Sequence, residues 1–197
     1  MKIEPSQTSL KSGLRSKIRK TRSGIDPELR KKHDDLINHH LLDYLRNSNH
    51  GIVAAYAAFD GEPDLMPALG LLEAEGLTIA LPVVQDEPGR SVISFRKWSS
   101  DSPMKSNRYG IREPVDAEEI IMPDIDVALI PLVAWDENRY RLGMGASFYD
   151  RLFQPYSGLK RPERIGVGYQ AQKVDRVPKE PWDVPMHAIL SESGIYK

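Results

Sequence analysis

Residues 127–135, Val-Ala-Leu-Ile-Pro-Leu-Val-Ala-Trp, and residues 140–151, Tyr-Arg-Leu-Gly-Met-Gly-Ala-Ser-Phe-Tyr-Asp-Arg, decide the expected fold of this chain. The first run is apolar without alternation, which predicts a strand buried on both faces of a parallel sheet. The second run places two glycines, two arginines and a carboxylate in one short loop before a helical segment. A strand, a glycine loop and a helix start in this order aim backbone N–H groups at an anion such as phosphate.

The loop does not match a standard nucleotide-binding fingerprint. The chain has no Gly-x-x-x-x-Gly-Lys-Ser/Thr, and no third glycine completes a Gly-x-Gly-x-x-Gly pattern after Gly143 and Gly145. From the residues alone, two interpretations stay open. The loop either binds a polyanion, or it is a tight turn whose glycines supply positive φ while Arg141 and Arg151 remain solvated.

Length and composition indicate a single α/β domain over residues 1–197, since a domain averages about 150 residues and no linker divides the chain. The chain has no cysteine, which excludes disulfides, a thiolate nucleophile and a zinc–thiolate site and fits a reducing compartment. No apolar run approaches the roughly 20 residues that span a bilayer, and the N-terminus lacks the apolar core of a signal peptide. We therefore expect a soluble, cytoplasmic protein that does not associate with membranes.

Hydrophobic periodicity alternates between strands and helices along the chain. Asp26-Pro27 predicts a helix start, with Asp as the N-cap, and Asp64 is expected to cap another helix that ends near Gly76. Strands are expected at residues 52–58, 78–84, 92–98, 127–133, 165–169 and 188–190. This βα rhythm predicts a three-layer α/β/α fold, with a mainly parallel sheet and helices on both faces.

The N-terminal segment predicts a basic helix at about residues 9–23. Six basic residues and no acidic residue lie between Lys11 and Arg22, beside an apolar stripe of Leu10, Leu14 and Ile18. A solvated face is the ordinary interpretation of such a stripe, and contact with nucleic acid or a membrane is the alternative. The stripe is short, it carries no aromatic residues for base stacking, and the net charge of the chain is −1. We therefore expect neither nucleic acid nor a membrane as a partner.

Candidate ligand-binding residues follow from the position of the loops. In open parallel sheets, ligands bind beyond the carboxyl ends of the strands. Glu62 follows the first expected strand, the loop with Arg141 follows the long apolar strand, and Trp182-Asp183 precedes the last strand. Each of these is a weak signal alone, because a carboxylate in a turn is more often a cap or a solvated charge. Their convergence on one sheet edge indicates a site.

The order of these motifs resembles that of the 5-formyltetrahydrofolate cyclo-ligase family. The resemblance covers nearly the whole chain. Its most specific part is the loop, while the N-terminal and late motifs are weak alone but stand in the expected order. The matching residues are Lys11 with Leu14-Arg15, Glu62, Arg141-Leu142-Gly143-Met144-Gly145 with Phe148-Tyr149-Asp150-Arg151, and Trp182-Asp183-Val184-Pro185.

The resemblance implies ATP- and Mg²⁺-dependent closure of 5-formyltetrahydrofolate to 5,10-methenyltetrahydrofolate, with release of ADP and phosphate. In this family the formyl oxygen takes the γ-phosphoryl group to give an imidate phosphate, and the N10 amine then attacks the activated carbon and expels phosphate. The protein's share is positioning and charge neutralisation, which need no cysteine or serine nucleophile. ATP, Mg²⁺ and the folate are the implied ligands, and a monomer is expected.

The resemblance also implies a role for each matching residue. The residues expected at ATP are Lys11, Arg15, Arg141, Leu142, Gly143, Met144, Gly145, Ala146, Ser147, Phe148 and Tyr149. Catalytic contributions are expected from Arg141, Gly145 and Tyr149, and the Mg²⁺ ligands are expected to be Asp150 and Asp183. The folate is expected to contact Glu62, on the pterin side, together with Tyr109, Met144, Gly145, Ser147 and Phe148.

Four residues depart from the pattern of many relatives. Ala146-Ser147 stands where many have further glycine, and Met144 stands where many have arginine or lysine. His187 occupies a position that is often aspartate, and we expect it to be structural. Because the main loop residues are kept, the enzyme interpretation is preferred. The alternatives are a catalytically lapsed relative that binds folate or nucleotide to regulate, and a nucleic-acid module that uses the basic stripe.

Overall fold

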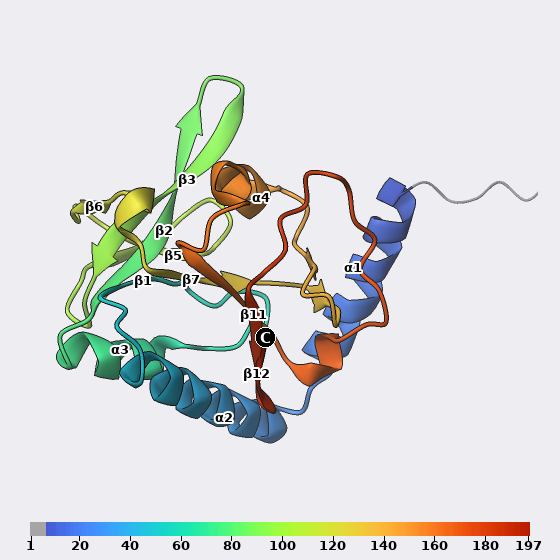
Figure 1. The fold of residues 1–197 in the computed structure, drawn as a ribbon, viewed down its shortest axis with the longest axis horizontal. Coiled ribbons are helices and arrows are strands. Elements are labelled where there is room, and N and C mark those ends of the chain that lie inside the picture. The colour runs from blue at the N-terminus through green and yellow to red at the C-terminus, as the bar shows by residue number, and fades with distance from the viewer. Residues whose placement is uncertain (1–6) are drawn as a thin grey trace, which may run out of the picture.

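The computed structural model describes residues 7–197, and its centre is a mainly parallel sheet (Figure 1). Among the described residues this sheet has eight strands in the order β12-β11-β10-β7-β1-β2-β3-β6. The parallel strands are β1 (Ile52–Ala54), β2 (Thr78–Glu87), β7 (Val127–Pro131), β10 (Glu163–Val167) and β11 (Ala188–Ser191). The antiparallel strands β3 (Arg90–Trp98), β6 (Glu119–Ile120) and β12 (Gly194–Tyr196) lie at its two edges.

Helices cover both faces of this sheet, which confirms the predicted fold class. On one face, α2 (Pro27–Arg46) and α3 (Met66–Ala74) bury Ile37, Leu41, Leu45, Leu69 and Leu72 against the strands. On the other face, α4 (Phe148–Phe153) buries Phe153 in a second apolar cluster (Figure 1). The helix α1 (Gln7–Ser23) packs through Ile18 and Leu14 against Val133, Ala134 and Leu142, which follow β7 in the chain.

The predicted helix starts are present at the atomic level. Asp26 Oδ1 accepts hydrogen bonds from the backbone N–H groups of Glu28 and Leu29, which caps α2. The N-cap of α3 is Leu65, one residue after the predicted Asp64, whose Oδ1 accepts from Met66 N just before the helix. Gly76 adopts a φ of 98° just after that helix ends, as predicted. The basic helix runs over residues 7–23, and of its predicted apolar stripe Ile18 is buried while Leu10 is exposed.

The predicted strand over residues 127–133 is shorter in the structure. The strand β7 ends at Pro131, which has no N–H to donate to a sheet ladder. The chain then forms a separate hairpin of β8 (Ala134–Trp135) and β9 (Arg141–Leu142), whose turn is held by hydrogen bonds from Asn138 N and Tyr140 N to Asp136 Oδ1. The glycine loop therefore leaves from this hairpin and not directly from the buried strand.

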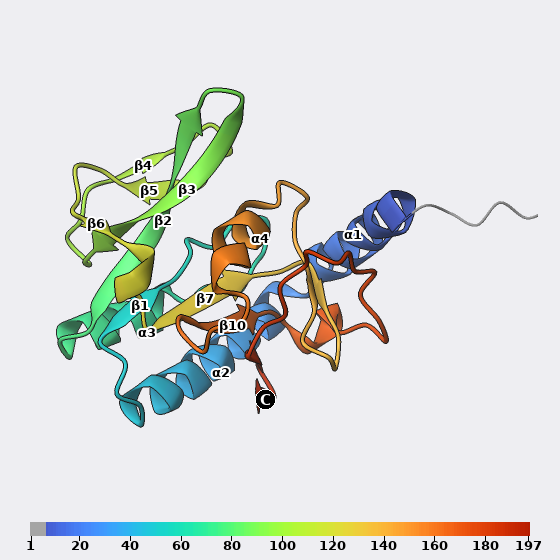
Figure 2. The ribbon, with the colours of Figure 1, turned by 45° about the horizontal axis from the view of Figure 1, so that its top comes forward.

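Smaller elements complete the chain. The strand β1 ends at Ala54, four residues before the predicted end, and a two-stranded ribbon of β4 (Met104–Ser106) and β5 (Arg112–Pro114) lies beside β2 and β3 (Figure 2). Three short 3₁₀ turns are η1 (Met122–Asp124), η2 (Gln154–Tyr156) and η3 (Gln170–Gln172). No helix within residues 7–197 has the length and apolar character needed to cross a membrane.

Candidate active site

A cleft of about 620 Å³ opens at the carboxyl ends of the parallel strands. Its floor includes Tyr56, Pro131 and Leu132, which follow or end β1 and β7. Every site residue predicted from the sequence lines this one cleft, namely Lys11, Arg15, Glu62, Tyr109, Arg141, Leu142, Gly143, Met144, Gly145, Ala146, Ser147, Phe148, Tyr149, Asp150 and Asp183. Residues 172 positions apart in the chain thus share one wall, as Lys11 and Asp183 do.

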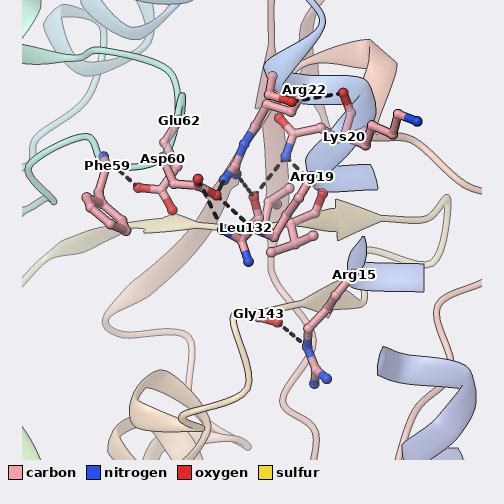
Figure 3. Close-up of polar contacts among 12 residues, drawn as sticks. Arg15, Arg19, Lys20, Arg22, Phe59, Asp60, Glu62, Leu132 and Gly143 are labelled. Atoms are coloured by element: carbon pink, nitrogen blue, oxygen red, sulfur yellow. Dashed lines mark hydrogen bonds and ion pairs between the residues drawn. The ribbon is translucent and has the colours of Figure 1, made fainter. Parts of the chain in front are cut away.

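The helix α1 supplies two cations to the cleft. Lys11 Nζ lies 2.7 Å from Asp183 Oδ2, and both side chains are largely buried. Asp183 Oδ2 also accepts from Glu180 N, which fixes the turn that carries Asp183. One helical turn further along, Arg15 Nε donates to the carbonyl oxygen of Gly143 at 2.8 Å, as Figure 3 shows. The same helix therefore contacts both the glycine loop and the turn before β11.

The glycine loop is anchored at its base by an ion pair whose arginine is buried and whose aspartate is partly exposed. Arg141 is 8% exposed, and its guanidinium donates to Asp150 Oδ1 at 2.7 Å and to the carbonyl oxygen of Val184 at 3.2 Å. Beyond this anchor the loop is open to solvent, because Met144 to Ser147 are exposed. Gly145 has a φ of 104°, and an added Cβ there would lie 3.5 Å from Arg15 Cζ. The backbone N–H groups of this exposed stretch are free to approach a ligand in the cleft.

Glu62 also lines the cleft, on a tight turn after β1. Its Oε2 accepts a hydrogen bond from Phe59 N at 3.1 Å. Burial raises the pKa of the Glu62 carboxyl to about 7, against the opposing effects of the Arg22 charge and of the bond from Phe59 N. Burial, together with the charge of Glu62, also raises the pKa of the Tyr149 hydroxyl. Tyr149 is therefore a neutral hydrogen-bond donor at neutral pH.

Glu113 is a cleft residue that carried no sequence signal strong enough to single it out, whereas Trp182 was singled out together with Asp183. Glu113, on β5, is 3% exposed and lines the cleft, where its Oε1 accepts from Val84 N and from Asn107 Nδ2. Trp182 is 60% exposed at the rim, beside Asp183. Glu113 sits in a ribbon whose packing depends on strands distant in sequence, so its burial could not be read from its neighbours in the chain.

The carboxylates of the cleft fit a magnesium ion that would be bound jointly by the protein and by substrate phosphates. No group of three or more His, Asp or Glu side chains among residues 7–197 could hold a metal by itself. Asp150 and Asp183 are two carboxylates in one cleft, and Mg²⁺ is typically bound by one or two carboxylates, with water and substrate phosphates completing its octahedron. His187 has a different environment, because its Nδ1 accepts from Arg164 N at 2.9 Å.

Similarity in sequence and similarity in structure both point to the same family of enzymes. A 5-formyltetrahydrofolate cyclo-ligase from Haemophilus influenzae is 32% identical over 93% of this chain and 98% of its own, and one from Escherichia coli is 31% identical over 91% and 99%. The structure of a 5,10-methenyltetrahydrofolate synthetase from Aquifex aeolicus superimposes with a TM-score of 0.77 at 29% identity, covering 95% of this chain and 92% of that one. The model of the 5-formyltetrahydrofolate cyclo-ligase family matches residues 7–192, and this chain belongs to that family.

Proposed function

We propose that this protein closes 5-formyltetrahydrofolate to 5,10-methenyltetrahydrofolate at the expense of ATP, with Mg²⁺ bound. The observation that carries the proposal is the convergence of all the family-type residues on one cleft, in a chain that belongs to the family. We also propose that the protein acts as a monomer. Lys11, Arg15 and the glycine loop form its nucleotide end, and Glu62 with Tyr109 forms its folate end.

The proposed reaction has two steps. The formyl oxygen attacks the γ-phosphorus and ADP leaves, and the N10 amine then attacks the activated carbon and expels phosphate. Lys11 and Arg15 neutralise the phosphates, while Arg141 and the N–H groups of the loop hold the transferred group in line. Asp150 and Asp183 would hold Mg²⁺, which supplies positive charge against the phosphates. Glu62 orients the pterin through its amino-pyrimidine edge.

Four of the six cations of the basic stripe contact the chain's own groups. Lys11 pairs with Asp183, Arg15 binds the carbonyl oxygen of Gly143, and Arg19 and Arg22 both bind Asp60. A helix that presents its cations to a nucleic acid would leave them facing solvent. The internal contacts therefore favour the enzyme over the nucleic-acid module.

The test follows the absorbance of the methenyl product with 5-formyltetrahydrofolate, ATP and Mg²⁺ present together. We expect turnover that requires all three. Arg46→Gln serves as a control, because Arg46 forms an exposed pair with Glu75 outside the cleft. Isothermal titration with ATP and with the folate accompanies the assay. Binding of both ligands without turnover would identify a lapsed relative, and binding of neither would refute the proposal.

A further inference from the structure

Arg22 is a buried cation that the proposed reaction does not use. It is 0% exposed, and it follows Arg15 by seven residues, so both lie on the same face of α1. Its guanidinium donates to Asp60 Oδ2 at 2.7 Å and to the carbonyl oxygen of Leu132 at 3.2 Å. Its Nε is buried and has no hydrogen-bond partner within residues 7–197. Burial of a charge lowers the stability of the fold unless its partners are well placed, so a functional role for Arg22 is worth testing.

The partner of Arg22 lies in the turn that carries Glu62. Asp60 adopts a left-handed φ of 52° and Gly61 a φ of 76°, which reverses the chain within the turn. The guanidinium of Arg30 packs against Gly61, where an added Cβ would lie 3.3 Å from its nearest nitrogen. At the far side of the turn, Tyr56 donates its hydroxyl to the carbonyl oxygen of Pro63. Arg19 also binds both carboxylate oxygens of Asp60, and together these contacts hold the turn that places Glu62 at the cleft.

A single helix face therefore holds both ends of the cleft. Figure 3 shows Arg15 reaching the carbonyl oxygen of Gly143, and Arg22 lying between Asp60 and Leu132, further along the same helix. Leu132 itself lines the cleft, directly after β7. Arg22 thus joins three segments, the helix α1, the end of β7 and the turn 59–62, at the point where they meet.

We propose that Arg22, acting through Asp60, is a positioning residue that fixes the 59–62 turn so that Glu62 meets the folate. The proposal rests on the folate role given to Glu62 under the proposed function. It assigns the second half of α1 to the folate end of the cleft, whereas Lys11 and Arg15 serve the nucleotide end. In this proposal the basic face of α1 sets the distance between the two bound substrates.

The charge of Arg22 also acts on Glu62 directly. The ionisable groups around Glu62 are Arg22 from α1, Asp60 from the same turn, Tyr56 after β1 and Tyr149 from α4. Arg22 lowers the pKa of Glu62, while burial and Asp60 raise it. Removal of Arg22 should therefore raise the pKa of Glu62 further, so that ionisation of the carboxylate requires a higher pH.

The experiment compares Arg22→Met, Arg22→Lys and Asp60→Asn with the parent protein. We expect Arg22→Met to raise KM for 5-formyltetrahydrofolate by roughly tenfold, while KM for ATP changes by less than about twofold. Arg22→Lys should restore part of the loss, because it keeps the charge. In Arg22→Met the pH at which folate affinity is half-maximal should move upward. Lys20→Gln is the matched control, since Lys20 is exposed on the same helix and its side chain points away from the cluster (Figure 3).

Glu62→Gln separates failure of this proposal from failure of the folate assignment. If Glu62→Gln leaves folate affinity unchanged, the role given to Glu62 is wrong and the positioning role falls with it. If Glu62→Gln weakens folate but Arg22→Met does not, only the positioning role is overturned. An equal rise of both KM values would also overturn it, since that indicates an undocked helix. The loss in Arg22→Met should be much smaller in the Glu62→Gln background. Melting curves show which variants fold, and Asp60→Asn decides between these outcomes if Arg22→Met does not fold.

Discussion

Asp150→Asn should lower both stability and turnover, for separate physical reasons. The Arg141 side chain is 4% exposed and donates at 2.7 Å to Asp150, whose side chain is 23% exposed. Removal of one partner from a fully buried ion pair costs about 3–5 kcal/mol. Because Asp150 is partly solvated and the carbonyl oxygen of Val184 still accepts from Arg141, we expect about 2 kcal/mol here. For a chain of 197 residues this corresponds to a Tm lower by about 4–8 °C.

Thermal unfolding without ligands measures the first effect, and the methenyl absorbance assay at limiting Mg²⁺ measures the second. Asp35→Asn is the matched control, because it removes a carboxylate from an exposed pair with Lys31 and should cost well under about 1 kcal/mol. Asp150→Glu keeps the charge and should lose less stability than Asp150→Asn. If Asp150→Asn has the same Tm as the Asp35→Asn control, the ion pair between Arg141 and Asp150 does not stabilise the loop. If it cyclises the folate at the parental rate in limiting Mg²⁺, the metal role of Asp150 is wrong.

Three further variants probe the rest of the cleft. Lys11→Met should raise KM for ATP by roughly tenfold and leave folate affinity nearly unchanged, and equal losses in titrations of the two ligands would indicate that α1 has undocked. Because burial raises the pKa of Glu62 to about 7, affinity for a folate that pairs with the ionised carboxylate should rise as pH increases through 7, and a pH series with Glu62→Gln should be flat. Met144→Arg should lower KM for ATP modestly, since an added charge-assisted contact is worth about 1.5–3 kcal/mol at best and Met144 is exposed. The gain should shrink as salt is raised, and no change at low salt would show that position 144 points away from the phosphates.

Local signals in the sequence predicted the fold well. The Asp26 cap, the helices it separates and most of the parallel strands depend on neighbours within a few residues, and these were correct. The end of β7 at Pro131 could have been predicted, because proline has no N–H to donate to the sheet. The apolar residues on both sides of Pro131 instead favoured a longer strand. The bond between Arg22 and Asp60 spans 38 positions, and a cation on a helix looks the same in sequence whether it is solvated or buried. The cleft residues were identified through family motifs, but their ion pairs, such as Lys11 with Asp183, could be seen only in the structure.

The pairing has a consequence for how ligands enter the cleft. Each carboxylate proposed for Mg²⁺ is paired with a cation: Asp183 with Lys11 and Asp150 with Arg141. Each of these two pairs is therefore neutral in itself, which avoids uncompensated charge at these two positions of a partly buried site. ATP alone would bring phosphates toward two carboxylates, and Mg²⁺ alone would compete with two cations. If both bound together as proposed, the phosphates would pair with Lys11 and Arg141 and the two carboxylates would hold the metal, so that each charge would keep a partner. Under the proposed function, nucleotide and metal must therefore bind as a cooperative pair.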